Sequence, residues 1–221
     1  MTGFRIDMHA HFYGGALPEI LRKRQGRPRL RRLPDGTESM LAMNGEFPFS
    51  AAYSDPAVGL AQMDAMGITH RMITFPGALG VDLLPAEYAP AISAFNRHLV
   101  GLTNETKGRL IGLAGLPLAD IALATREMAA IRHLGLPGVI LPGNYFLTAD
   151  AVQPLRPVLA EASRIGALIM VHPGLLVGQD PPPLPHDHPQ YRTSALDLQN
   201  QIAQTALTLV ISDLLETYPG I

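Results

Sequence analysis

Phe4-Arg-Ile-Asp-Met-His-Ala-His-Phe12 forms a short apolar run that ends in two histidines, and it predicts the first strand of the fold. Side chains two residues apart on a strand point to the same face, roughly 7 Å apart along it. His9 and His11 can therefore bind one divalent cation together as neutral nitrogen ligands. Taken alone, the pair fits two neighbouring surface histidines equally well.

A second histidine follows a later apolar run, Gly166-Ala-Leu-Ile-Met-Val-His-Pro-Gly174. Such a continuous run is typical of a strand buried on both faces, and Pro173-Gly174 turns the chain directly after His172. A lone histidine there is more often a hydrogen-bonded structural residue. Together with His9 and His11 at matched depth, it favours a metal site with three histidine ligands. Zinc suits these ligands, and manganese fits nearly as well.

Composition restricts the class of protein. Hydrophobic residues make up 47% of the 221 residues and charged residues 16%, which predicts a single globular domain over 1–221. The net charge of −2 gives no general attraction to nucleic acid or to an anionic membrane, and no apolar run approaches the roughly 20 residues that span a bilayer. The chain starts with a charged strand instead of a signal segment, so a cytoplasmic location is expected. Because cysteine is absent, a metal would be held by histidine and carboxylate.

Strand-like and helical patterns alternate along the chain, which is typical of βα units around a parallel sheet. An irregular insertion at about 13–53 interrupts them, with Pro34-Asp-Gly36 as a turn between two hairpin arms. The expected strands cover about 4–11, 68–75, 110–116, 138–141 and 167–172, and the expected helices about 54–67, 86–105, 120–135, 155–166 and 194–217.

The predicted fold class is α/β, of the (β/α)₈ TIM-barrel type, truncated after about five βα units. A closed barrel needs eight units, typically in about 250 residues. The chain is then either a fragment of a longer enzyme or an open sheet whose edge needs a partner. The second case predicts a homo-oligomer.

Seven basic residues without an intervening acid lie between Arg22 and Arg32. A solvated hairpin explains them, and a nucleic-acid patch is disfavoured because aromatic residues are not interleaved. A sharper hypothesis is that Arg29, Arg31 or Arg32 covers the metal site and binds a substrate carboxylate through paired hydrogen bonds.

Three segments occur in an order that resembles the amidohydrolase superfamily, specifically its "amidohydrolase 2" branch similar to aminocarboxymuconate-semialdehyde decarboxylase. They are Ile6-Asp-Met-His-Ala-His-Phe12, Arg109-Leu-Ile-Gly-Leu-Ala-Gly-Leu-Pro117 and Gly166-Ala-Leu-Ile-Met-Val-His-Pro-Gly174. The resemblance spans essentially the whole chain and implies a distorted (β/α)₈ barrel with a metal at its carboxyl-terminal mouth. It matches His9 and His11 to the ligands of strand one, and His172 to the ligand of strand five.

The same resemblance implies a fourth ligand, an Asp after strand eight, and a catalytic His after strand six. Both are expected beyond Ile221, so no catalytic residue is assigned. Asp213 is expected within a helix and is no substitute. Members with two metals bridge them with a carboxylated Lys at the end of strand four, where this chain has Leu141-Pro-Gly143. One divalent metal is therefore expected.

These observations favour a mononuclear metal-dependent enzyme that acts on a small carboxylated substrate, as a decarboxylase (a C–C lyase) or as a hydrolase. One alternative is a non-catalytic or incomplete barrel fragment that serves as a binding or assembly module. Another is a metal-dependent deoxyribonuclease, which would show salt-sensitive DNA binding through the arginine-rich insertion.

The remaining polar candidates have weaker patterns. His70, His98 and His133 are expected to be structural or surface residues. His186 and His188 fall in a proline-rich loop that is expected to be a solvated lid. Asp7 is interpreted either as a residue that orients a neighbouring group of the site or as a packing or capping residue.

Overall fold

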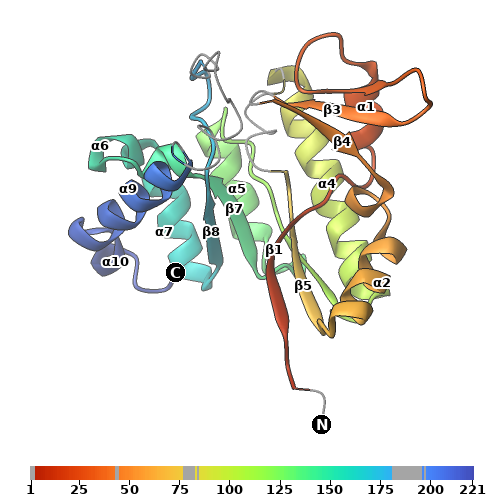
Figure 1. Ribbon diagram of the computed structural model, residues 1–221. Coiled ribbons are helices and arrows are strands. Elements are labelled where there is room, and N and C mark those ends of the chain that lie inside the picture. The colour runs from red at the N-terminus through yellow and green to blue at the C-terminus, as the bar shows by residue number, and fades with distance from the viewer. Residues whose placement is uncertain (1–2, 43–44, 77–82, 84, 181–195, 197) are drawn as a thin grey trace.

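The computed structural model describes residues 3–42, 45–76, 83, 85–180, 196 and 198–221. Its centre is a layer of parallel strands that follow one another in chain order (Figure 1). They are β1 (Ile6–His11), β5 (His70–Thr74), β6 (Leu110–Leu113), β7 (Gly138–Pro142) and β8 (Leu168–His172). Strands β1, β5 and β6 form one ladder and β7 and β8 another, and a parallel bridge from Ala114 to Val139 connects the two. The predicted α/β class with parallel strands is confirmed.

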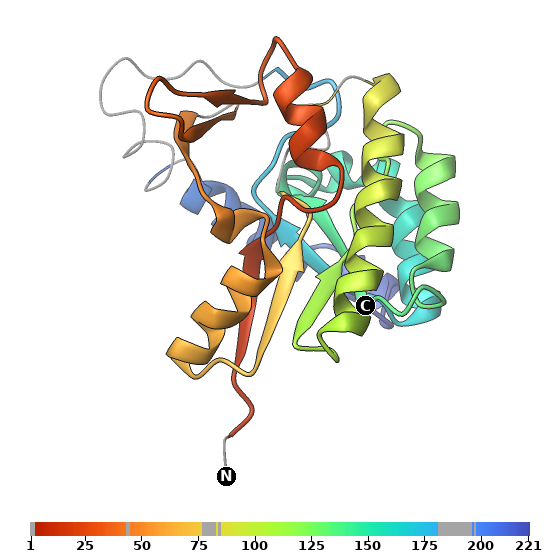
Figure 2. The ribbon, with the colours of Figure 1, turned by 90° about the vertical axis from the view of Figure 1, so that its right-hand side faces the viewer.

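Helices lie along one side of this layer (Figure 2). The longer ones are α2 (Pro56–Met66), α4 (Pro85–Glu105), α5 (Ile121–Ala130) and α7 (Arg156–Ile165), with the short α6 (Ala149–Val152) and the 3-10 turns η2 (Gly143–Phe146) and η3 (Gln153–Leu155) between β7 and α7. Their ends follow local chemistry. The Asp55 and Asp120 side chains accept hydrogen bonds from backbone N–H groups of the first turn of α2 and α5. Gly67 and Gly166 end α2 and α7 in the left-handed conformation.

The insertion contains more structure than the sequence predicted. Pro34-Asp-Gly36 turns the chain between β2 (Arg29–Arg32) and β3 (Glu38–Ala42), as expected, but β4 (Gly45–Phe49) adds a third antiparallel strand. A helix, α1 (Leu17–Lys23), precedes the sheet and was not predicted. Its N-cap, Ala16, makes no side-chain hydrogen bond, so the start signals that the sequence does carry are Pro18 and Glu19 in the first turn. A 3-10 turn, η1 (Ala51–Tyr53), leads into α2.

The carboxyl-terminal helix differs from the expected 194–217 span. Residues 181–195 and 197 lie outside the described part, and beyond them the chain forms α9 (Leu198–Ile211) and α10 (Leu214–Thr217). Asp213 therefore stands at the start of α10, not in the middle of a helix, and the earlier expectation was wrong on this point. Its carboxylate binds Arg156 at 2.8 Å, which ties the end of the chain to α7.

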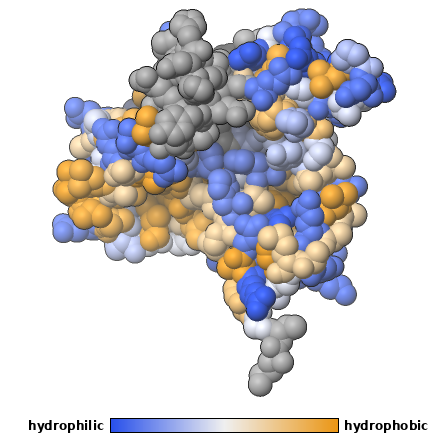
Figure 3. Space-filling model, viewed as in Figure 1, coloured by the Kyte–Doolittle hydropathy of each residue, from blue (hydrophilic) through white to orange (hydrophobic). Residues whose placement is uncertain are grey.

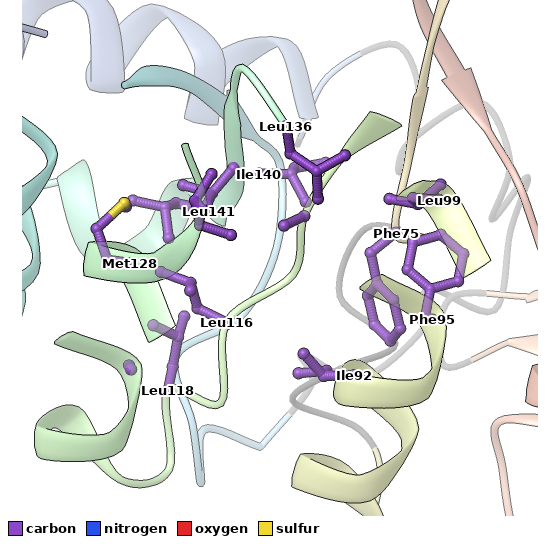
Figure 4. Packing of buried hydrophobic residues seen from close by; sticks show 14 of the residues in the cluster. Phe75, Ile92, Phe95, Leu99, Leu116, Leu118, Met128, Leu136, Ile140 and Leu141 are labelled. Carbon is purple, nitrogen blue, oxygen red and sulfur yellow. The ribbon is translucent and has the colours of Figure 1, made fainter. Parts of the chain in front are cut away.

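The hydrophobic core lies between the strands and their helices. Figure 4 shows Phe75 at the end of β5 packed against Phe95 and Leu99 of α4. Every residue of β7 is buried. Gly138 permits this close packing, because a Cβ there would lie 1.8 Å from the carbonyl oxygen of Leu168.

Strand β8 corrects one expectation from the sequence. Its apolar run predicted burial on both faces, but Leu168 is 40% exposed and the rest of the strand is only half-buried. Among the described residues β8 pairs only with β7, so its other edge and part of its surface have no neighbour. Among those same residues, no helix is long and apolar enough to cross a membrane.

Candidate metal centre

Three histidines meet at the carboxyl end of the parallel layer. His9 and His11 come from the end of β1, and His172 is the last residue of β8. Their ring centroids are 4.7 Å apart for His9 and His11, 4.9 Å for His9 and His172, and 4.8 Å for His11 and His172. One ligand atom from each ring lies within 4.8 Å of the others. The structure thus brings together the three residues selected from the sequence.

The spacing of the rings fits a small cation. Zinc–nitrogen bonds of about 2.0–2.1 Å in a tetrahedral site put ligand nitrogens roughly 3.3 Å apart. Rotation and a small inward shift of the three rings would close the present spacing to that value. No described carboxylate completes this cluster, which consists of the three imidazoles.

Hydrogen bonds fix which nitrogen of two rings faces the cluster. The Nδ1 atom of His172 lies 2.8 Å from the carbonyl oxygen of Pro173, which can only accept, so Nδ1 carries the proton. Nε2 then offers its lone pair. The Nδ1 atom of His11 lies 3.2 Å from Oγ1 of Thr74, and that hydroxyl also reaches the carbonyl oxygen of Ala10 at 3.4 Å. If the hydroxyl donates to Ala10, it accepts from Nδ1 of His11, which also leaves Nε2 free.

Burial keeps two of these imidazoles, those of His11 and His172, uncharged. The pKa of His11 falls from 6.5 to about 3, mainly through burial and also through the neighbouring His172 and His9. Burial also lowers the pKa of His172, with a smaller contribution from His9, although the hydrogen bond to the Pro173 carbonyl acts in the opposite direction. Neutral imidazoles are the form that binds metal, so the site is ready for a cation near neutral pH.

The candidate arginines belong to the insertion. Arg29, Arg31 and Arg32 lie on β2, in the antiparallel sheet beyond the carboxyl ends of the parallel strands (Figures 1 and 2). Arg31 binds Glu46 of β4, with Nη2 2.7 Å from Oε1. Arg22 binds Glu38 of β3 in the same way, with two bonds of 2.7 Å. Two residues of the basic run, Arg22 and Arg31, are therefore ion-paired within the insertion, and a substrate role for its arginines stays a prediction.

The other histidines of the described ranges lie apart from the cluster. His70 starts β5 and stacks on Phe4 with ring centroids 4.6 Å apart. His98 belongs to α4 and stacks on Phe12 at 5.9 Å, and His133 is exposed after α5. His186 and His188 lie outside the described residues.

Sequence reasoning missed two polar residues, Thr74, which contacts the cluster, and Arg71, which contacts Asp7 on the strand of His9 and His11. Thr74 is fully buried and contacts His11, and Arg71 binds Asp7 with Nε 2.8 Å from Oδ2. The sequence could have indicated Thr74, because it is a polar residue at the end of an apolar strand. It could not have indicated Arg71, because its partner Asp7 lies on a strand that is distant in the sequence.

Comparison with known proteins agrees with the geometry. No family model matches the chain. The curated 2-amino-3-carboxymuconate-6-semialdehyde decarboxylase of Dictyostelium discoideum is 24% identical over 182 residues, which are 80% of this chain and 50% of that protein. The chain thus spans about half the length of this relative. The resemblance expected from the sequence is confirmed.

Solved structures show the same fold. The apo form of IDCase from Metarhizium anisopliae superposes with a TM-score of 0.81 at 15% identity, over 99% of this chain and 63% of that one. A dihydroxybenzoic acid decarboxylase from a Polaromonas species, solved with bound manganese and the inhibitor 2-nitroresorcinol, gives a TM-score of 0.59 at 20% identity. This match covers 99% of this chain and 63% of the decarboxylase.

Proposed function

We propose that this chain forms the metal-binding part of a mononuclear, divalent-metal-dependent enzyme of the amidohydrolase-2 type that acts on a small carboxylated substrate. The main support for the proposal is that His9 and His11 of β1 and His172 of β8 lie together, although β1 and β8 are the two outermost described strands of the parallel layer. Each relative compared above with a reaction in its name is a decarboxylase, which favours decarboxylation over hydrolysis.

The three histidines would hold the cation through nitrogen atoms. When bound, a divalent cation supplies Lewis acidity that polarises a substrate oxygen or acidifies a water molecule. The chain's own contribution is to keep His11 and His172 neutral by burial and to orient their rings through Thr74 and the Pro173 carbonyl. Zinc and manganese both suit this donor set, and manganese is present in the dihydroxybenzoic acid decarboxylase.

Decarboxylation would break the C–C bond to a substrate carboxylate, release CO₂ and leave a carbon that takes up a proton. The residue that delivers this proton and a fourth ligand are expected outside this chain's 221 residues, by the resemblance given above. Arg29 and Arg32 are proposed to bind a substrate carboxylate, because Arg31 already binds Glu46.

Metal titration tests the proposal. Calorimetric titration of the purified, chelator-treated chain with Mn²⁺ or Zn²⁺ should show one site, and His172→Ala should abolish it. His133→Ala is the matched control, since it removes an exposed histidine and should leave binding unchanged. Absence of a stoichiometric site in the unmodified chain would contradict the proposal. Release of CO₂ from dihydroxybenzoate would separate decarboxylation from hydrolysis.

We further propose that the chain self-associates. Large apolar side chains are exposed along α9 and α10, where Figure 3 shows a hydrophobic surface, and they include Leu207 at 58%, Val210 at 75%, Ile211 at 73% and Leu215 at 58%. A patch of this kind favours a protein–protein contact, here with a second copy. Sedimentation velocity should show a dimer or larger assembly, and Val210→Glu should shift it toward monomer. A monodisperse monomer of the unmodified chain would contradict this.

Two finer expectations, a barrel that stops after five βα units and a cytoplasmic location, stay predictions. The structure supports the first by its parallel strands in chain order with open outer edges on β1 and β8 among the described residues.

A further inference from the structure

The strand that carries His9 and His11 contains an irregularity. In its pairing with β5, Asp7 lies opposite Arg71 and Ala10 lies opposite Ile73. The chain advances three residues on β1 while it advances two on β5. One extra residue is therefore inserted in β1 between Asp7 and Ala10, which makes a β-bulge.

The two sides of this bulge face different parts of the molecule. Asp7 binds Arg71, whose Nη1 lies 3.9 Å from the position of a Cβ on Gly59 in α2, so this pair faces the helix layer. His9 and His11 face His172 at the metal centre. On a regular strand, residues 7, 9 and 11 would share one face. The extra residue is what separates the carboxylate from the two imidazoles.

One carboxylate holds both sides of the bulge. Oδ2 of Asp7 accepts from Nε of Arg71 at 2.8 Å, and Oδ1 accepts from the backbone N–H of His9 at 3.2 Å. The Arg71 side chain is 13% exposed and that of Asp7 27% exposed, so the pair is largely shielded from water. The first contact fixes β1 to β5, and the second fixes the backbone of a proposed ligand.

We propose that Asp7, held by Arg71, is a positioning residue for the metal centre: it clamps the bulge that turns His9 toward His11 and His172. This inference rests on the proposed metal site. Bulges next to functional sites re-aim side chains, and the bulge of β1 does so for His9. Asp7 itself contacts the backbone of His9 and not the cluster of ring nitrogens.

Mn²⁺ titration of four variants tests the inference. Asp7→Ala removes both contacts and should weaken Mn²⁺ binding about 10–100-fold, the usual effect of losing a group that orients a ligand. Asp7→Asn keeps an oxygen for the His9 N–H and should restore part of the affinity. Arg71→Met should give an intermediate loss. Asp64→Asn is the control, because it removes another Asp–Arg pair, with Arg109 at 2.5 Å, and should leave the affinity unchanged.

A double-mutant cycle separates positioning from general destabilisation. If Asp7 acts through His9, Asp7→Ala should cost almost nothing further in a His9→Ala background. Equal Mn²⁺ affinity of Asp7→Ala and the unmodified chain would overturn the inference, as would fully additive losses in the cycle. Failure of the unmodified chain to bind Mn²⁺ would instead overturn the proposed function. If Asp7→Ala does not fold, the Mn²⁺ affinities of Asp7→Asn and Arg71→Met test the inference instead, and unchanged affinity in both would overturn it.

Discussion

The central strand β7 of the parallel layer and the outer strands β1 and β8 differ in their surroundings. Every residue of β7 is buried, whereas β8 has a 40% exposed Leu168 and β1 a 48% exposed Met8. The candidate metal ligands lie on the two outer strands. Burial is thus concentrated in the middle of the layer, and the proposed chemistry lies on strands with fewer neighbours. The predictions below test this division.

The largest expected effect is in the central strand. Leu141→Ala in β7 removes a side chain with 0% exposure and should reduce the free energy of unfolding by about 2–5 kcal/mol, through lost burial and the cavity left behind. Leu168→Ala in β8 should cost less than about 1 kcal/mol, because much of that side chain is already in water. Urea denaturation measures both. Equal losses would show that the outer strand is as well packed as the central one.

The next prediction concerns the close contact between β7 and β8. Gly138→Ala would place a Cβ against the Leu168 carbonyl and should destabilise the chain by about 1–3 kcal/mol, because β8 must move away. The same shift displaces His172, so metal affinity should fall as well. Gly3→Ala, with no atom within 4 Å of the added Cβ, is the control. A loss of stability without any loss of metal affinity would show that the site tolerates movement of β8.

Low pH should reduce the free energy of unfolding of the metal-free chain, because His11 is buried in its neutral form. Burial lowers the pKa of His11 to about 3, so the unfolded state takes up a proton near pH 6.5 that the folded state refuses. The contribution of neutral His11 to the free energy of unfolding is present above pH 6.5 and is lost as the pH falls. Between pH 6.5 and 5.5, His11 alone should reduce this free energy by about 1 kcal/mol. Thermal melting of His11→Gln should be less sensitive to this pH change. An identical pH dependence in both proteins would contradict the prediction.

The smallest effect is expected in the insertion. Arg31→Met removes an ion pair between side chains that are 45% and 37% exposed, so it should change the free energy of unfolding by less than about 1 kcal/mol. Chemical denaturation with and without 0.5 M salt would check this. A large, salt-independent loss would mean that the pair is integral to the sheet.

Much of the parallel layer followed from the sequence, because its strands are apolar runs bounded by glycine and proline. The convergence of His9, His11 and His172 was also predictable, since all three lie near the carboxyl ends of parallel strands. Helix α1 was not predicted, because it is only seven residues long and has no capping side chain, although Pro18 and Glu19 in its first turn favour a helix start.

The burial of β8 and the bulge of β1 were beyond sequence reasoning as well. An apolar run does not reveal whether its strand has one neighbour or two. A bulge appears only in the register between two strands, and the pairing of Asp7 with Arg71 that accompanies it joins residues far apart in the chain.

Ligands on the first and last strands of the layer give a bound cation a mechanical role. It would join His9 and His172, which lie far apart in the sequence, in the folded state alone. Because only the folded chain brings these rings together, each tenfold rise in free metal above the dissociation constant should add about 1.4 kcal/mol to the free energy of unfolding. The concentration of free metal would thereby set the equilibrium stability of the folded chain.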